Sequence, residues 1–340
     1  MYHIIINPAS RSGEGRRLWS EAEPLFQESG RDYQVYFSSE EQSIRRLAEE
    51  ITANSEAADL VVMGGDGTLN EVLNGIRDFS KVRIGLIPTG SGNDFARDAG
   101  ISKNIREAAA SVLRDDNHRS LDLGVIRWKS CGLGESNVEA QNCGLNKILA
   151  EAPVSDSVQE RRFLISTGIG FDAQICFEAD HSRWKKLLNK LHIGKLIYIL
   201  VAIRLILTAV RAELTLKITA DTEAGSAEPA ILHFNDCLFA VCMNHRLEGG
   251  GFRFAPDASP TDGQLDVCVA SGISRPRFFA LFPLAYSGAH VNKRGVHVFK
   301  GSRISIESDI PLHIHTDGEV PDRAREVEVL VLPGAVRFLN

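Results

Sequence analysis

The stretch Gly64-Gly65-Asp66-Gly67-Thr68-Leu69-Asn70-Glu71 joins a short apolar run, residues 60–63, to a segment with the spacing of a helix. Three glycines in four positions let the backbone turn tightly and approach a ligand closely. A helix that begins just after such a turn directs its free N–H groups and the positive end of its dipole at one point. The stretch therefore predicts a phosphate-binding corner, with Asp66 holding a cation such as Mg²⁺. The alternative is an ordinary strand–turn–helix corner.

Two further segments share this plan. A second glycine-rich turn also follows an apolar run, Pro88-Thr89-Gly90-Ser91-Gly92-Asn93-Asp94-Phe95, and another loop follows the first apolar run of the chain, Asn7-Pro8-Ala9-Ser10-Arg11-Ser12-Gly13. In an open α/β sheet such turns lie together at the carboxyl ends of the strands, where ligands bind. None of the three matches the phosphate loop G-x-x-x-x-G-K-[ST] or the dinucleotide motif G-x-G-x-x-G. The usual NTPase and dinucleotide-binding interpretations are therefore disfavoured.

The chain divides into regions of different pattern. Residues 1–128 alternate apolar runs with segments of i, i+3, i+4 spacing, which predicts an α/β domain with a mostly parallel sheet and helices on both faces. Residues 129–160 are rich in Gly, Ser, Asn and Glu and predict a long loop or insertion. Residues 161–310 predict a β-rich domain, and residues 311–340 continue its strand pattern.

Composition narrows the function classes. The 340 residues carry a formal net charge of −6, which argues against a nucleic-acid partner. The six cysteines include no C-x-x-C pair, which favours reduced thiols in a cytoplasmic protein. The first residues predict a strand and lack the basic start of a signal peptide.

A basic, apolar segment covers residues 181–211 and contains no acidic residue. Lys195 and Arg204 interrupt its apolar run, so it is too broken to span a membrane. A basic amphipathic helix with a Trp can lie on an anionic surface, and Trp184, Arg183 and Lys185 fit that description. The alternative is a helix packed on the β-rich domain with its basic ends in solvent.

Taken together, these blocks resemble the diacylglycerol kinase catalytic-domain superfamily, specifically the bacterial soluble lipid kinases. Beyond the three turns the resemblance rests on residues 121–124 (Leu-Asp-Leu-Gly), 167–172 (Thr-Gly-Ile-Gly-Phe-Asp), 255–266 and 316–319 (Thr-Asp-Gly-Glu), in the order of the family. It implies a β-sandwich as the second domain, C-terminal strands that return toward the first domain, and an active site in the interdomain cleft. A long insertion at residues 129–160 departs from the usual pattern.

The resemblance also assigns roles to residues. The glycines and Thr68 would hold nucleotide phosphates, the loop from Asn7 would line the adenosine end, and Asp66 would hold Mg²⁺. The residues expected to bind the nucleotide are Asn7, Pro8, Ala9, Ser10, Gly13, Ser38, Gly64, Gly65, Asp66, Gly67, Thr68, Leu69, Asn70 and Ser91. Asp317 and Glu319 are both candidates for the general base, although Asp-Gly is also a favoured turn pair.

Two further metal roles follow from the resemblance. A structural Mg²⁺ is expected at Asp262, with main-chain carbonyls near Ser259 and Gln264. Asp122 is expected either to support the catalytic cation or to cap backbone N–H groups of a turn. His313 and His315 share a strand face, where packing is favoured over metal binding.

The sequence therefore predicts an ATP- and Mg²⁺-dependent lipid kinase that converts diacylglycerol to phosphatidic acid. Another lipid alcohol, such as a sphingoid base or a phosphatidylglycerol-type lipid, is the first alternative. An NAD kinase and a non-enzymatic nucleotide sensor are the others. The expected partner is a lipid at a membrane surface, reached by peripheral contact from the cytoplasm, and a homodimer is left open.

Overall fold

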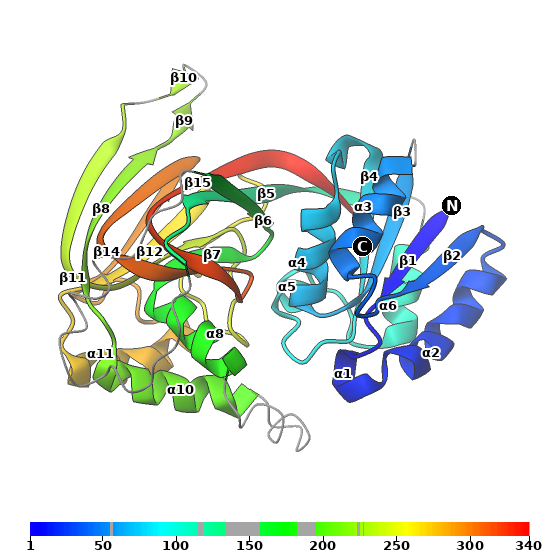
Figure 1. Cartoon of the computed structure of the whole chain (residues 1–340), viewed down its shortest axis with the longest axis horizontal. Helices are drawn as coiled ribbons and strands as arrows, with labels where there is room; N and C mark the ends of the chain where they lie inside the picture. Colours follow the sequence, from blue (N-terminus) through cyan, green and yellow to red (C-terminus); the bar gives the residue numbers. More distant parts are fainter. Residues whose placement is uncertain are drawn as a thin grey trace.

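The computed structural model describes residues 1–54, 57–114, 118–132, 157–181, 195–222, 225–226 and 228–339. Figure 1 shows an α/β half and a β-rich half, joined by strand β15 (Glu319–Leu339), which runs from one half into the other. At its end β15 pairs in parallel with β4 (Val82–Pro88) of the α/β half. The C-terminal strand therefore returns to the first domain, as the family resemblance implies.

The α/β half is built from four strands that pair in parallel. Their order is β2 (Tyr33–Phe37), β1 (Tyr2–Ile6), β3 (Ala58–Gly64) and β4. Alternate residues of β1 enter two different cores, because successive strand side chains point to opposite faces. One core holds α3 (Ile44–Asn54) and α4 (Asp66–Gly75), and the other holds α2 (Gly15–Glu28) and α6 (Ile105–Val112). Helices therefore cover both faces of this part of the sheet.

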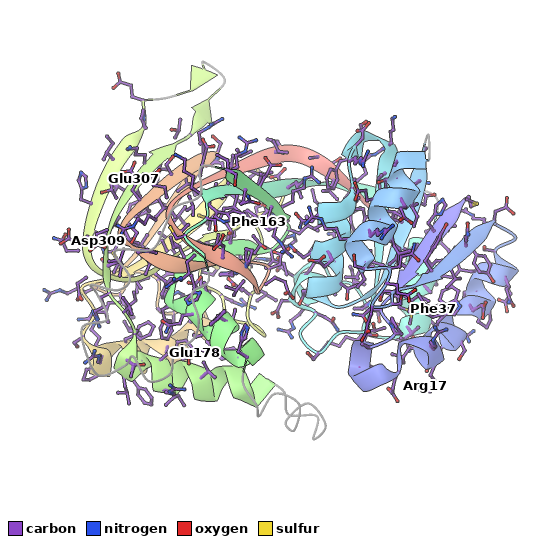
Figure 2. The ribbon with its side chains drawn as sticks, in the orientation of Figure 1. Arg17, Phe37, Phe163, Glu178, Glu307 and Asp309 are labelled. Atoms are coloured by element: carbon purple, nitrogen blue, oxygen red, sulfur yellow. The ribbon has the colours of Figure 1, made fainter. Side chains whose placement is uncertain are left out.

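The β-rich half pairs in an antiparallel manner. Its main strands are β5 (His118–Lys129), β6 (Val158–Phe163), β7 (Ser166–Gly170), β8 (Ala212–Thr219), β11 (Ala230–Met243), β12 (Leu265–Ser271), β13 (Val296–Gly301) and β14 (Arg303–Thr316). All of them join the strands of the α/β half in one hydrogen-bonded network. Figure 2 shows Phe163 in this half, where its ring packs on Gly124 and leaves no room for a Cβ there.

Three sequence-based boundaries need correction. β14 is one continuous strand, so the expected division between residues 310 and 311 falls inside it. β6 begins at Val158, within the expected insertion, and pairs with β5. The sequence pattern places β5 in the parallel domain, but among the described residues β5 pairs only antiparallel, with β15 and β6. The pattern of short apolar runs could not show that a bulge, rather than a break, separates Glu307 from Leu312. Residues 133–156 of the insertion lie outside the described residues.

Helices pack on one side of the β-rich half. They are α8 (Phe171–His181), α10 (Lys195–Thr208), α11 (Arg275–Leu281) and the 3₁₀ helix η3 (Phe282–Tyr286), which share one apolar core with β11 and β12. Among the described residues no helix is both long and apolar enough to cross a membrane. Residues 182–194, which carry Trp184 and several of the basic side chains of the expected surface helix, lie outside the described residues.

Candidate active site

The three turns of the first domain meet at one edge of the sheet. A Cβ on Gly90 would lie 2.5 Å from the Cα of Gly65, so the two glycine-rich turns touch backbone to backbone. The buried Thr89 hydroxyl donates to Ser10 Oγ over 3.1 Å, and Asn7 Nδ2 donates to Thr68 Oγ1 over 3.2 Å. The structure therefore brings together the loop at residues 7–13 and both turns, as the spacing predicts.

Asp66 bridges the two glycine-rich turns. Its Oδ2 accepts the N–H of Asp94 over 2.9 Å and its Oδ1 that of Phe95 over 3.2 Å, so it caps the short helix α5 (Asp94–Asp98). Burial raises the pKa of Asp66 to about 6, and the charges of Asp94 and Asp317 act in the same direction. A carboxylate under these conditions gains most from a nearby cation.

The Asp317-Gly318 turn brings the second domain to this edge. It closes the β14–β15 hairpin with φ of 50° at Asp317 and 88° at Gly318, the left-handed region that Asp-Gly turns favour. A Cβ on Gly67 would lie 2.6 Å from Glu319 Oε1, so this exposed glutamate stands against the first glycine-rich turn. Asp317-Gly318 is therefore both a β-turn and part of the candidate site, so the two interpretations from the sequence do not exclude each other.

The carboxylate of Asp317 is occupied by four donors. Its oxygens accept the N–H groups of Leu164, Ile165 and Ser166 at 2.8 to 3.1 Å, and Asn70 Nδ2 donates to Oδ2 over 2.8 Å. Asp317 therefore acts as a hydrogen-bond acceptor that fastens the turn to residues 164–166 and to α4.

A polar connection between the domains was not found from the sequence. Arg161 donates to Asn70 Oδ1 and forms a 2.7 Å ion pair with Glu71. Arg162 donates to the carbonyls of Leu73 and Ile76 at the end of α4. Their sequence signal is slight, because two arginines at the end of an expected loop look like solvent-exposed charges.

Two of the expected nucleotide ligands have other roles. The Asn70 side chain is fully buried and spends its hydrogen bonds on Asp317, Arg161 and Arg162. Leu69 points into the core and its N–H donates to Gly65 O, so it offers nothing to a nucleotide. Ser91 is exposed at the tip of the second turn, and Ser38 follows β2 with its N–H on Ile6 O beside the end of β1. These two positions remain compatible with nucleotide contact.

Two known protein families match the two halves of the chain. Residues 1–126 match the diacylglycerol kinase catalytic domain, and residues 165–340 match the YegS C-terminal NAD kinase beta sandwich-like domain. The chain belongs to the diacylglycerol kinase catalytic-domain family.

Relatives align along almost the full chain. A diacylglycerol kinase of Mycobacterium tuberculosis is 25% identical over 337 residues, 99% of this chain and 94% of the relative. One of Bacillus subtilis is 23% identical over 317 residues, 93% and 88% of the two chains. The crystal structure of a diacylglycerol kinase from Bacillus anthracis has a TM-score of 0.63 at 17% identity over 99% of this chain and 96% of that one, which shows the fold alone. Family membership makes the protein a kinase of the lipid-kinase class.

The carboxylates of Asp122 and Asp262 have partners outside the glycine-rich turns of the first domain. Asp122 accepts the N–H groups of Gly263 and Gly334 at 2.7 and 2.8 Å, which is the backbone-capping alternative and not support of the catalytic cation. Asp262 accepts the N–H of Gln264 and forms a 3.2 Å ion pair with Lys300, which also reaches Asp266 at 3.3 Å. Lys300 thus supplies positive charge at the carboxylate to which the family resemblance assigns a structural Mg²⁺, and that ion stays a prediction.

A buried cluster behind the Asp317 turn was not found as a unit from the sequence. His315 Nε2 lies 2.9 Å from Asp172 Oδ2 and 3.2 Å from Glu248 Oε1, and all three side chains are buried. Burial raises the pKa of Glu248 to about 7. Burial alone would lower the pKa of His315, but the two carboxylates raise it.

One imidazole and two carboxylates are the composition of a metal site. The position of the hydrogen on the His315 ring, however, does not fit metal binding. The N–H of Gly318 points at His315 Nδ1 over 3.3 Å, so Nδ1 accepts and Nε2 carries the hydrogen. A metal-bound histidine needs the opposite tautomer, with its lone pair on the nitrogen that faces the carboxylates. Nε2 therefore directs its hydrogen at Asp172 and Glu248, and the cluster is a hydrogen-bonded unit.

Proposed function

We propose that the protein transfers the γ-phosphoryl group of ATP to the free hydroxyl of diacylglycerol, with Mg²⁺, and forms phosphatidic acid. The observation that carries the proposal is the meeting of Glu319 with Gly67 and of Asp317 with Asn70. It sets acidic groups of the second domain against a phosphate-binding turn of the first. Phosphoryl transfer needs this combination of phosphate positioning, charge neutralisation and a proton acceptor.

The residues divide these tasks. The N–H groups of the two glycine-rich turns bind phosphate oxygens, and Asp66 holds the Mg²⁺ that accompanies the nucleotide. Glu319 is the better candidate for the base that accepts the hydroxyl proton, because it is exposed and stands against the turn. Asp317 is the weaker candidate, because four donors already occupy its oxygens. It instead holds Glu319 in place.

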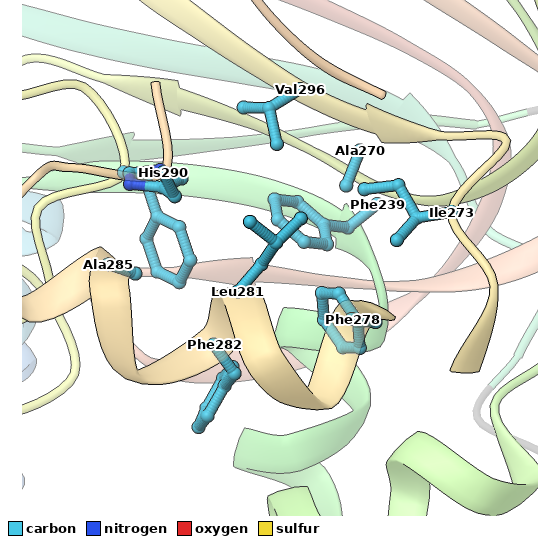
Figure 3. A pocket seen from close by; sticks show the side chains of 10 residues that line it. Phe239, Ala270, Ile273, Phe278, Leu281, Phe282, Ala285, His290 and Val296 are labelled. Atoms are coloured by element: carbon cyan, nitrogen blue, oxygen red, sulfur yellow. The ribbon is translucent and has the colours of Figure 1, made fainter. Parts of the chain in front are cut away.

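The second domain contains a small apolar cavity. Figure 3 shows it between the sheet residues Phe239, Ala270 and Val296 and the helical residues Phe278 and Leu281. The helical side ends at Tyr286, whose ring packs 4.1 Å from that of Phe252, and the nearby Gly250 N–H donates to Asp94 beside Asp66. The enclosed volume is about 20 Å³, which is room for a single water molecule, so the cavity as it stands holds no acyl chain and the lipid acceptor rests on the family.

The test is transfer of labelled phosphate from ATP to a panel of acceptors in mixed micelles: diacylglycerol, a sphingoid base, phosphatidylglycerol and NAD. We expect labelled phosphatidic acid, dependent on Mg²⁺ and absent in Glu319→Gln. Label on another lipid only would replace the acceptor in the proposal, and label on NAD only would overturn the lipid assignment. Glu213→Gln, on the exposed side of β8, is the matched control for loss of a carboxylate.

A further inference from the structure

The helical segment formed by α11 and η3 is apolar on its outer side as well as on its inner side. Phe278, Leu281 and Ala285 point into the core and line the cavity. Phe279, Leu284 and Tyr286 of the same segment are 54, 37 and 45% exposed. A surface helix of a soluble protein normally turns polar residues outward. This segment is also too short to span a bilayer.

The exposed apolar surface continues onto the neighbouring helix. α10 packs against α11 and buries Val201, Leu205 and Ile206 in the same core. Its outer side shows Ile203 and Leu207, which are 41 and 64% exposed. Five large apolar side chains of α10, α11 and η3 therefore face solvent. Grouped exposure of this kind marks a site of interaction rather than chance.

The chain segment that contains α11 is basic. Residues 267–306 contain six Lys or Arg and no Asp or Glu, in a chain whose net charge is −6. Arg275 and Arg277 open α11, are exposed, and form no ion pair with any of the described residues. On α10, Arg204 is paired with Glu178 at 3.7 Å, so among the described residues of these helices the unpaired arginines are those of α11.

We propose that the outer surface of α11, η3 and α10, the docking surface, lies in the interface of an anionic lipid bilayer. Phe279, Leu284 and Leu207 enter the acyl region, and Arg275 and Arg277 meet lipid phosphates. The contact of Tyr286 with Phe252, and of Gly250 with Asp94, joins this surface to the glycine-rich turns. A lipid hydroxyl at the interface is thereby brought toward Asp66. This inference deepens the proposed function and rests on it for that last step.

Vesicle co-sedimentation without ATP tests the docking surface independently of catalysis. Vesicles of phosphatidylcholine with and without phosphatidylglycerol separate the apolar contribution from the ionic one. We expect Phe279→Ala with Leu284→Ala to weaken binding to both kinds of vesicle. Arg275→Gln with Arg277→Gln should weaken binding to the anionic vesicles roughly tenfold and abolish most of its salt dependence.

Matched controls remove similar groups elsewhere. Ile231→Ala removes a 55% exposed apolar side chain of β11, and Lys103→Gln with Arg106→Gln removes two exposed charges of the first domain. Wild-type binding by the α11 variants, equal losses in the controls, or no binding of the wild type to anionic vesicles would each overturn the proposal. A dimer of the wild type that dissociates in Phe279→Ala with Leu284→Ala, with vesicle binding unchanged, would reassign the surface to a second copy of the chain. Failure of the kinase assay alone would leave vesicle binding intact.

A separate observation concerns the base of the Asp317 turn. His315 Nδ1 accepts the Gly318 N–H, and Nε2 is held by Asp172 and Glu248 from beneath. A Cβ on Gly168 would collide with both Asp172 and His315, so that glycine makes room for their contact. The structure assigns His315 as a positioning residue: it fixes the turn that presents Glu319 to Gly67. This assignment also rests on the proposed function.

Two substitutions separate the nitrogens of the ring. In His315→Asn the amide oxygen replaces Nδ1 and can keep the Gly318 bond, whereas in His315→Gln the amide nitrogen replaces Nε2 and that bond is lost. We expect His315→Gln to lower kcat at least tenfold with KM for ATP nearly unchanged, and His315→Asn to keep kcat within about threefold. Amide hydrogen exchange at Gly318, measured by NMR, should be protected in the Asn variant only. Equal exchange in the two variants would overturn the assignment even if no lipid acceptor were found.

Discussion

Two aspartates lie where the domains meet, near enough for the charge of Asp317 to raise the pKa of Asp66, and their surroundings differ. Asp66 accepts two N–H groups, lies among other carboxylates, and has its pKa raised to about 6. Asp317 accepts three N–H groups and an amide, all from groups that pin its turn in place. The same type of residue therefore has two different roles at these two positions. One carboxylate is left short of positive charge, as a cation site requires, and the other is saturated, as a structural anchor requires.

The largest effect on activity is expected for Asp66→Asn, which tests whether Asp66 holds a cation. We expect phosphoryl transfer to fall by roughly a hundredfold or more, because a residue that holds Mg²⁺ contributes several kcal/mol to the transition state. The melting temperature should change little, because removal of a buried charge offsets the loss of one accepted hydrogen bond. Near-normal turnover of a folded Asp66→Asn protein would contradict the cation role.

Asp317→Asn should show the reverse pattern. An amide group placed among four donors leaves at least one of them unpaired and brings two donors together. We expect a loss of about 2 to 4 kcal/mol in the free energy of unfolding, measured by urea denaturation. Glu213→Gln, at an exposed carboxylate of β8, is the control and should cost much less. An Asp317→Asn protein as stable as the wild type would mean that Asp317 is not an anchor.

The contrast also explains what the sequence could and could not predict. The glycine-rich turns, the parallel pairing of the first strands and the position of the two turns side by side follow from local spacing within residues 1–95, whereas the bonds of Asp66 to Asp94 and Phe95 do not. The donors of Asp317 come from Asn70 and from residues 164–166, which a pattern read along the chain does not connect with residue 317. Glu248 and Asp172 join His315 in the same non-local way. The family resemblance identified Asp317 and Glu319 as candidates for the base. Only the folded structure distinguishes the anchored Asp317 from the exposed Glu319.

Glu248→Gln sharpens the comparison through pH. The folded-state pKa of Glu248 is raised to about 7 from 4.5, so its proton stabilises the fold fully below about pH 4.5, and that contribution is lost as pH rises through 7. The always neutral Gln has no such loss. The variant should therefore gain stability over the wild type between pH 5 and 8, by about 2 to 3 kcal/mol at the upper end. Thermal melts across this range measure it, with exposed Glu213→Gln as control, and a constant difference would refute the buried proton.

The smallest expected effect is at Asp262, where a cation and a lysine compete for one carboxylate. Lys300 lies 3.2 Å from Asp262 and 3.3 Å from Asp266, and its partly exposed pair with Asp262 contributes no more than about 1 kcal/mol. An ammonium group there lowers the gain from Mg²⁺, so millimolar Mg²⁺ should raise the melting temperature of the wild type only slightly. In Lys300→Gln the carboxylates lose their partner, and the Mg²⁺-dependent rise should become larger. In Asp262→Ala it should vanish. If Asp262→Ala responds to Mg²⁺ as the wild type does, the ion binds elsewhere, and the contrast between a carboxylate that needs a cation and one already satisfied would apply at Asp66 alone.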